Sequence, residues 1–250
     1  MVTESHLLRW IVALSALGVL FHVFVGRRAT SAVKAVGPGL VLAAFALAVR
    51  CALILRALGP DAVLRDHVYR WIAAGGFVAD AAFRLDALSA VMILVVTGVG
   101  FLIHVYSVGY MHHDPGFARY FAYLNLFTTA MLILVLADNL LLLFVGWEGV
   151  GLCSYLLISF WYDKVENAVA GKKAFLVNRV GDAAFLLGLF LLVWTVGRSG
   201  GEWTLDIAAL EHQRDALATA TVGGWPVATV VALLLFVGAT GKSAQIPLYV

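Results

Sequence analysis

Residues 137–162 read ADNLLLLFVGWEGVGLCSYLLISFWY, and this stretch decides the fold of the chain. As an α-helix, it is long enough to cross a hydrocarbon layer about 30 Å thick. Near its middle it carries one carboxylate, Glu148. An ionised side chain at that depth costs about 2.5 to 3.5 kcal/mol, so we expect Glu148 to be either neutral or paired with a cation. Later apolar segments offer Arg179, Asp182 and Lys242 as neighbours, for an ion or proton pathway or for structural ion pairs between helices.

The composition excludes a soluble domain. Of the 250 residues, 62% are hydrophobic and 13% are charged, which leaves too little polar surface to face water. The 17 Lys and Arg residues are spread thinly and form no basic stripe, so we expect no nucleic-acid partner. Cys51 and Cys153 both lie inside apolar runs, where a buried free thiol is the usual state. Without paired cysteines or a His-rich cluster, we expect no metal, haem or iron–sulfur site in this chain.

Seven apolar segments predict an all-α polytopic membrane protein with six full transmembrane helices and a partial, broken seventh. The segments are residues 8–25, 40–58, 87–106, 117–136, 137–162, 168–196 and 226–250. Basic residues dominate the first and fifth loops, whereas the sixth loop is acidic. These basic residues are Arg27, Arg28, Lys34, Lys164, Lys172 and Lys173. By the positive-inside rule, the odd-numbered loops are cytoplasmic and the N-terminus lies outside.

The loop between the second and third segments, residues 59–86, carries a hairpin signal. Two runs with strand character, residues 67–72 and 77–85, flank the sequence AAGG. A Gly-Gly pair between two such runs favours a tight turn, so we predict a short β-hairpin in this outer loop. An irregular loop is the alternative.

Three charged residues of the sixth apolar segment and one histidine of the third are further candidates. Arg179 and Asp182 are three residues apart, so they share a face and can form a local ion pair. Lys172, one heptad before Arg179, extends a polar line toward the cytoplasmic end. His104 is a candidate proton relay, although a lone histidine on an apolar helix is commonly a hydrogen-bonded structural residue. A structural role is also open for the Arg179–Asp182 pair.

Lys242 stands just before a predicted helix break. Pro247 lacks a backbone N–H and clashes with the carbonyl of Ser243, four residues earlier, so the helix is expected to end or kink directly after Lys242. Broken helices at membrane depth line water or are buried in protein. Lys242 and Glu148 together predict a switchable proton site. A lysine that extends its ammonium to the membrane interface is the alternative.

Several motifs resemble those of one family and occur in the same order. They are FVGWEGVGLCSYLL at 144–157, NRVGD at 178–182 and GKSAQIP at 241–247, with support from FRLDALS at 83–89 and TGVGFLIHVYSVGYM at 97–111. They are similar to motifs of the antiporter-like membrane subunits of respiratory complex I, and most similar to the chain 5 (subunit L) group. The resemblance is strong from about residue 77 to residue 250 and weak over the first two spans.

The resemblance implies a proton-translocating membrane subunit of NADH:quinone oxidoreductase, which moves protons across the membrane as electrons pass from NADH to quinone. It implies that Glu148 is the family's glutamate, Lys242 its broken-helix lysine, and Arg179 and Asp182 its coupling residues. It further implies that NAD, FMN, iron–sulfur clusters and quinone bind to other subunits. The implied partners are the lipid bilayer and other membrane subunits, including a neighbouring antiporter-like subunit, in a bacterial inner membrane.

The resemblance also implies a division of the chain, because family members are longer and are built on inverted repeats. We expect residues 1–116 to hold transmembrane helices 1–3 with the hairpin loop, and residues 117–250 to hold the first antiporter-like repeat, incomplete at its C-terminus. Two other functions stay open: the large subunit of a multisubunit Na⁺/H⁺ antiporter, and a non-transporting structural membrane spacer.

Overall fold

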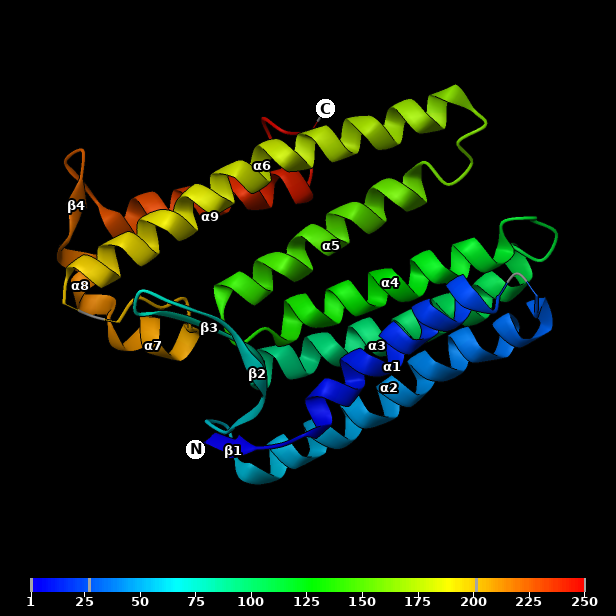
Figure 1. Ribbon diagram of the computed structural model, residues 1–250, viewed down its shortest axis with the longest axis horizontal. Coiled ribbons are helices and arrows are strands. Elements are labelled where there is room, and N and C mark those ends of the chain that lie inside the picture. The colour runs from blue at the N-terminus through cyan, green and yellow to red at the C-terminus, as the bar shows by residue number, and fades with distance from the viewer. Residues whose placement is uncertain (1, 27, 201, 250) are drawn as a thin grey trace.

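The computed structural model describes residues 2–26, 28–200 and 202–249. The helices are α1 (Leu7–Phe24), α2 (Thr30–Leu58), α3 (Ala87–Tyr110), α4 (Phe117–Leu136), α5 (Leu140–Ile158), α6 (Val165–Arg198), α7 (Ile207–His212), α8 (Arg214–Thr219) and α9 (Val227–Lys242). The strands are β1 (Val2–Glu4), β2 (Val63–Ala74), β3 (Phe77–Leu85), β4 (Thr221–Val222) and β5 (Trp225–Pro226). Within the described ranges, α1 to α6 are long and apolar enough to cross a membrane, and α9 is a shorter apolar helix. The chain is therefore an all-α, multi-pass integral membrane protein, as predicted (Figure 1).

Several helices begin at residues that differ from the predicted ones, and α5 and α2 show physical reasons for it. Helix α5 begins three residues later than expected, because the side chain of Asn139 accepts a hydrogen bond from the Leu142 N–H at 2.9 Å and caps the helix. Helix α2 begins at Thr30, ten residues before the predicted start at residue 40, and contains Pro38. Proline is tolerated inside a membrane helix where neighbouring helices cover the freed backbone group, and Pro38 is buried.

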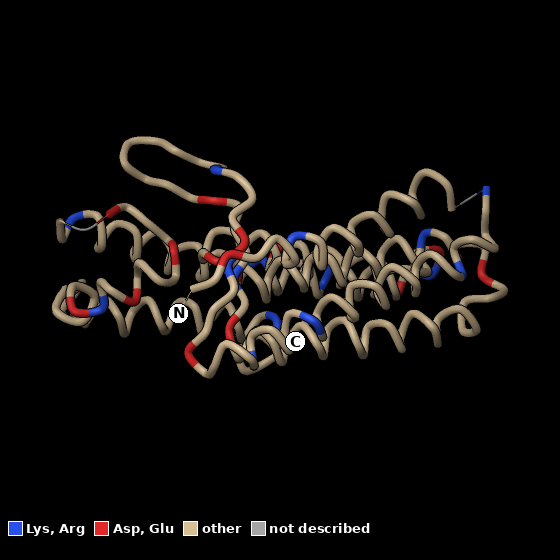
Figure 2. The backbone as a smooth tube through the Cα atoms, turned by 90° about the horizontal axis from the view of Figure 1, so that it is seen from below, with Lys and Arg blue, Asp and Glu red and all other residues tan. Residues whose placement is uncertain are grey.

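The predicted β-hairpin is confirmed. Strands β2 and β3 pair antiparallel across Gly75 and Gly76, whose φ angles of 57° and 87° are favourable for glycine. A third strand, β1, pairs parallel with β2, with Val2 opposite Val63, and this pairing was not predicted. Figure 2 shows the hairpin standing out from the helical bundle, with acidic and basic residues gathered near its base.

We call the end of the bundle that carries the hairpin the hairpin end. The N-terminal strand, the hairpin, the α4–α5 connection and the segment with α7 and α8 all lie there (Figure 1). Isolated β-bridges join these segments, namely Phe83 to Ala137, Val78 to Thr204 and Asn139 to Asp206. The connections that follow α2, α4 and α6 thus lie at the same end of the bundle as the N-terminal strand, which agrees with the predicted alternation of the spans. That the N-terminus lies outside stays a prediction, and Arg27, one of the basic residues behind it, lies outside the described residues.

An ion-pair cluster fastens the hairpin end, and we call it the clamp. Arg65 of β2 donates from Nε to Asp138 at 2.6 Å and from Nη2 to Asp206 at 3.0 Å. Asp138 follows α4 and is 2% exposed. Burial raises the pKa of the Asp138 carboxyl above its usual 3.8, and the opposing charge of Arg65 does not fully offset that rise. The clamp joins residues of the hairpin, the α4–α5 connection and the α6–α7 connection.

The helices form two packing groups. The apolar core of the first group lies between α1, α2, α3 and α4 and includes Leu8, Ile93 and Leu132, which are fully buried. A separate apolar cluster joins α6 and α9 to α5 through Phe185, Val231 and Phe144. Figure 1 shows α6 and α9 side by side, with α5 between them and the first group. The charged residues predicted to act together all lie on α5, α6 and α9.

Candidate functional site

Glycines allow α5 to approach α4 closely and α6 to approach α9 closely. A Cβ on Gly146 of α5 would collide with the backbone of Leu134 in α4, so only glycine fits the α4–α5 contact. On α6, a Cβ on Gly181 would lie 3.1 Å from the carbonyl oxygen of Gly238 in α9. Charged side chains on α5, α6 and α9 lie within reach of one another. Glu148 lies on α5, Arg179 and Asp182 on α6, and Lys242 is the last residue of α9.

Arg179 joins the two carboxylates. Its Nη1 donates a hydrogen bond to Glu148 Oε2. The same nitrogen lies 3.7 Å from Asp182 Oδ2, which confirms the local pair predicted from the three-residue spacing. The guanidinium also lies 4.4 Å from the centroid of the Phe175 ring, within the range of a cation–π contact. Arg179 therefore has contacts on both α5 and α6.

Lys242 points into the same cluster. The helix ends at Lys242, as the position of Pro247 predicted. Its Nζ lies 3.8 Å from Asp182 Oδ1, and the side chain is 16% exposed. The Nζ atom is buried and makes no hydrogen bond with any described residue. The interfacial alternative for Lys242 does not fit this arrangement, because the ammonium lies against a buried carboxylate.

The pairing of the charges differs from the predicted one. We expected Lys242 and Glu148 together to form a switchable proton site, with Arg179 as another candidate cation for Glu148. Among the described residues, Glu148 pairs with Arg179 and Lys242 pairs with Asp182, and no Glu148–Lys242 ion pair lies within 4.0 Å. The reason is the shape of α6, which places Arg179 and Asp182 on one face between the other two helices. Among the ion pairs of the described residues, Glu148 is therefore connected to Lys242 by way of Arg179 and Asp182.

Trp147 was not among the site residues predicted from the sequence, and the structure places it inside the cluster. Its Nε1 donates to Asp182 Oδ1 at 2.6 Å. Lys242 Nζ lies 5.5 Å from the centroid of its ring, and the ring stacks on Phe185 with centroids 5.0 Å apart. The signal that could have found it is its position, since Trp147 stands beside Glu148 in the middle of the span and not at its end.

The structure does not bring the two predicted relay residues into this cluster. His104 of α3 is buried, with Nδ1 2.7 Å from the Gly100 carbonyl and Nε2 3.3 Å from Asn125 Nδ2. These are the contacts of a hydrogen-bonded structural histidine. Lys172 is exposed on α6, two turns before Arg179. The relay roles of His104 and Lys172 stay predictions.

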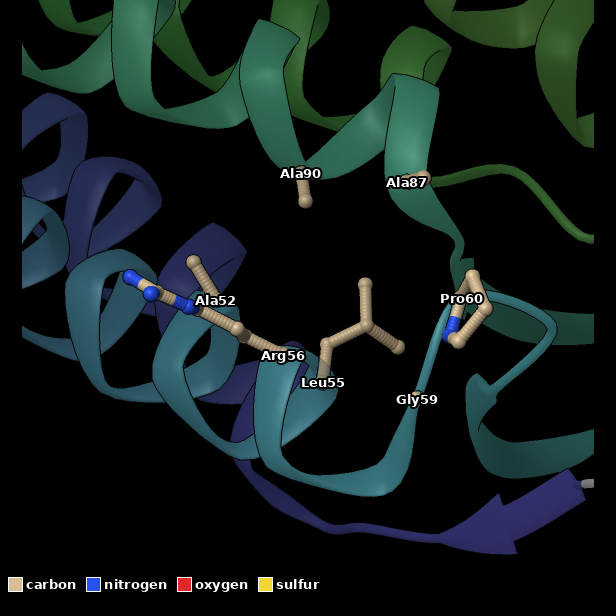
Figure 3. Close-up of a pocket in the computed structure, with 7 residues that line it drawn as sticks. All are labelled: Ala52, Leu55, Arg56, Gly59, Pro60, Ala87 and Ala90. Atoms are coloured by element: carbon tan, nitrogen blue, oxygen red, sulfur yellow. The ribbon is translucent and has the colours of Figure 1, made fainter.

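A pocket of about 390 Å³ lies elsewhere, between the end of α2 and the start of α3 (Figure 3). Leu55 and Arg56 line it from α2, and Ala87 and Ala90 from α3. None of the predicted site residues lines this pocket. In the described part of the chain, no group of three or more His, Cys, Asp and Glu side chains lies in an arrangement that could hold a metal ion. The charge cluster on α5, α6 and α9 therefore remains the candidate site.

Comparisons with known proteins place the chain in one family. Residues 71–121 match the family model described as NADH-ubiquinone oxidoreductase (complex I), chain 5 N-terminus. Residues 137–250, which hold the whole charge cluster, match the model described as NADH:quinone oxidoreductase/Mrp antiporter, transmembrane.

Curated relatives named NADH-quinone oxidoreductase subunit L include two bacterial proteins. The Mycobacterium tuberculosis protein is 45% identical over 245 residues, which cover 98% of this chain and 37% of the relative. The Pseudomonas aeruginosa protein is 48% identical over 181 residues, which cover 72% of this chain and 28% of the relative. The chain thus spans about a third of the length of these relatives.

A solved structure supports the same grouping. A chain of the Mrp complex from Dietzia sp. DQ12-45-1b is 28% identical and superposes with a TM-score of 0.70, covering 97% of this chain and 24% of that chain. Family models, relatives and structure agree with the motifs around Glu148, Arg179 and Lys242. The chain belongs to the family of antiporter-like membrane proteins that NADH:quinone oxidoreductase and the Mrp antiporters share.

Proposed function

We propose that this chain acts as a proton-translocating membrane subunit of NADH:quinone oxidoreductase, with Lys242 carrying the proton. The observation that supports this most directly is the cluster of two acids and two bases on α5, α6 and α9, where Lys242 Nζ is buried 3.8 Å from Asp182. Intramembrane ionisable groups face the interior of a bundle and mark ion and proton pathways. The relatives named subunit L support the choice of complex.

The mechanism follows from the order of the pairs. Glu148 holds Arg179, and Asp182 is shared between Arg179 and Lys242. When a signal from a neighbouring subunit moves Glu148 away, Arg179 turns fully to Asp182, and Asp182 then stabilises the charge on Lys242 less well. Two unit charges about 4 Å apart interact by about 4 kcal/mol at an effective dielectric constant of about 20, and doubling the distance halves this energy. The attraction that is lost when this distance doubles exceeds the roughly 1.4 kcal/mol that corresponds to a tenfold change in proton affinity.

The proposal extends to the surroundings of the chain. The redox chemistry takes place in other subunits, which hold NAD, FMN, iron–sulfur clusters and quinone. The chain contacts other membrane subunits, including a neighbouring antiporter-like subunit, in a bacterial inner membrane with the N-terminus outside. The basic residues near the α1–α2 and α5–α6 connections support this orientation. The division at residues 116 and 117 is part of the same proposal.

The experiment compares Glu148→Gln and Lys242→Ala with the unmodified full-length protein in its complex. Proton pumping driven by NADH is measured in inverted membrane vesicles, and assembly is checked on native gels. We expect both variants to assemble and to lose pumping. Lys173→Ala is the matched control, because Lys173 is exposed on α6 and contacts none of the four charged residues of the cluster. Normal pumping in both site variants would contradict the proposal and favour a structural spacer.

A second candidate is the large subunit of a multisubunit Na⁺/H⁺ antiporter. The Dietzia Mrp chain favours it, because its superposition covers nearly the whole of this chain. The same vesicles separate the two functions. A proton movement that needs NADH supports the oxidoreductase, whereas one that is driven by a sodium gradient without NADH supports the antiporter.

A further inference from the structure

We propose that Trp147 is a positioning residue of the Lys242 proton site: its indole N–H holds the Asp182 carboxylate where it can face Lys242. This inference rests on the proposed function. Trp147 lies directly before Glu148 on α5, and its ring reaches across to α6 and to the end of α9.

Asp182 depends on Trp147 for its one side-chain hydrogen bond within the described residues. The residue is 3% exposed, so water reaches it poorly. The Trp147 Nε1–Oδ1 distance of 2.6 Å is short for a nitrogen donor, and bonds to a charged acceptor are shorter than bonds between neutral groups. The two cations stand at ion-pair distances, 3.7 Å for Arg179 and 3.8 Å for Lys242, and Oδ2 has no hydrogen-bond partner. The indole therefore sets the orientation of the carboxylate.

The aromatic ring of Trp147 is itself held in place. It stacks on Phe185 with centroids 5.0 Å apart and an interplanar angle of 29°. Phe185 stacks in turn on Phe144, one helical turn before Trp147, with centroids 5.7 Å apart. Offset ring pairs of this kind add stability beyond the burial of their area. The packing of the ring thus fixes the direction of the indole N–H toward Asp182.

The same ring contacts the proton carrier. Lys242 Nζ lies 5.5 Å from the Trp147 ring centroid, within the range over which a cation is attracted to an indole face. One side chain therefore touches both members of the Asp182–Lys242 pair. Any displacement of α5 relative to α6 moves Trp147 together with Glu148, because the two residues are adjacent. We infer that Trp147 transmits a movement of Glu148 directly to Asp182, in addition to the path through Arg179.

The test distinguishes the contribution of the indole N–H from the contribution of the shape of the ring. Trp147 is replaced by Phe, and in a second variant by 3-benzothienylalanine, which keeps the fused ring and exchanges only the N–H for sulfur. Both are made in the full-length protein in its complex. The measured quantity is the Lys242-dependent part of NADH-driven proton pumping, which is the difference between the unmodified protein and Lys242→Ala. We expect this part to fall about tenfold in both variants, because a hydrogen bond to a charged group contributes enough energy for a factor of that size.

The matched control is the same pair of substitutions at Trp194, which is 55% exposed on α6 and makes no contact with the charge cluster. These variants should pump normally. A 3-benzothienylalanine variant that assembles and pumps normally would overturn the proposal, since only packing would then matter. A variant that keeps the ring but fails to assemble would overturn it as well. If Lys242→Ala itself leaves pumping unchanged, the proposed function fails before Trp147 is tested.

Discussion

Two charge clusters of this molecule, the clamp and the cluster on α5, α6 and α9, are built differently. In the clamp at the hairpin end, Arg65 makes hydrogen bonds of 2.6 Å and 3.0 Å to two carboxylates. In the cluster on α5, α6 and α9, the ion pairs of Asp182 are 3.7 Å and 3.8 Å long, and Lys242 Nζ has no hydrogen-bond partner among the described residues. The clamp uses its hydrogen-bonding capacity. The cluster of Glu148, Arg179, Asp182 and Lys242, which we call the mid-span cluster, leaves part of its own capacity open. Open capacity in a buried site is what allows a proton, a water molecule or a new partner to enter.

The location of the two clusters explains the difference. The clamp lies outside the spans, and the Arg65 side chain is 37% exposed, so solvent helps to stabilise its charge. The mid-span cluster lies between membrane-spanning helices, where the side chains of Asp182 and Lys242 are only 4% and 16% exposed and their charges depend on the protein for stabilisation. We therefore expect substitutions in the clamp to change mainly stability, and substitutions in the mid-span cluster to change mainly function. The following predictions test that division, from the largest expected change in stability to the smallest.

Arg65→Met should cause the largest loss of stability. It leaves the 2% exposed Asp138 without its cation and frees Asp206 from β2. Breaking a buried ion pair costs about 3 to 5 kcal/mol, and the partial exposure of Arg65 reduces this to about 2 to 3 kcal/mol. The measurement is the thermal unfolding temperature of the full-length protein in detergent. Arg70→Met is the control, because Arg70 is 65% exposed and 3.7 Å from its partner Asp80. Equal losses for the two variants would contradict the role of the clamp.

Gly146→Ala should destabilise the contact between α4 and α5 by about 2 kcal/mol. The added Cβ would lie 2.6 Å from the Cα of Leu134, and backbone atoms cannot move aside as a side chain can. Gly39→Ala on α2 is the matched control, since a Cβ there meets nothing within 4 Å. Thermal unfolding compares the two. An unchanged unfolding temperature for Gly146→Ala would show that α4 and α5 are not held at this distance.

Asp138→Asn should cost about 1 kcal/mol or less, because it removes a desolvated charge together with its ion pair. Burial raises the pKa of Asp138, so the folded protein holds this proton at pH values where the unfolded chain has released it. The stability that this proton provides is present below pH 3.8 and is lost as the pH rises through the raised pKa.

The pH dependence supplies the measurement for Asp138→Asn. The difference in stability between the unmodified protein and the variant should become smaller as the pH rises from about 4 toward neutrality. Unfolding temperatures of both proteins are recorded across this range. A constant difference between the two curves would show that Asp138 has the same proton affinity in the folded and unfolded chains.

The sequence was sufficient to predict the elements whose causes are local. Mean hydropathy over about twenty residues identifies a span, Gly75 and Gly76 identify the hairpin turn, and Pro247 identifies the end of α9 after Lys242. The three-residue spacing of Arg179 and Asp182 gave their ion pair. Each of these features depends on neighbours within a few helical turns.

Contacts between distant segments were not predictable in the same way. The pairing of β1 with β2 and the bonds of Arg65 to Asp138 and Asp206, 73 and 141 positions apart, depend on how whole helices pack. The exchange of partners in the mid-span cluster has the same cause. Four charges were found from the sequence, but which acid meets which base depends on the rotation of α6 between α5 and α9. Trp147 was missed because its role depends on its contact with Asp182, 35 positions away.

Gly151→Ala should have the smallest effect on stability and a large effect on function. The added Cβ would collide with Lys242 Nζ, which is the mobile end of a long side chain and can move aside. The unfolding temperature should therefore stay within the change that Gly109→Ala produces at an open position on α3. The ammonium, however, has to leave its place beside Asp182, so NADH-driven pumping should fall toward the level of Lys242→Ala. A stable variant that pumps normally would show that Lys242 needs no fixed distance from Asp182, and the two clusters would then differ in strength only.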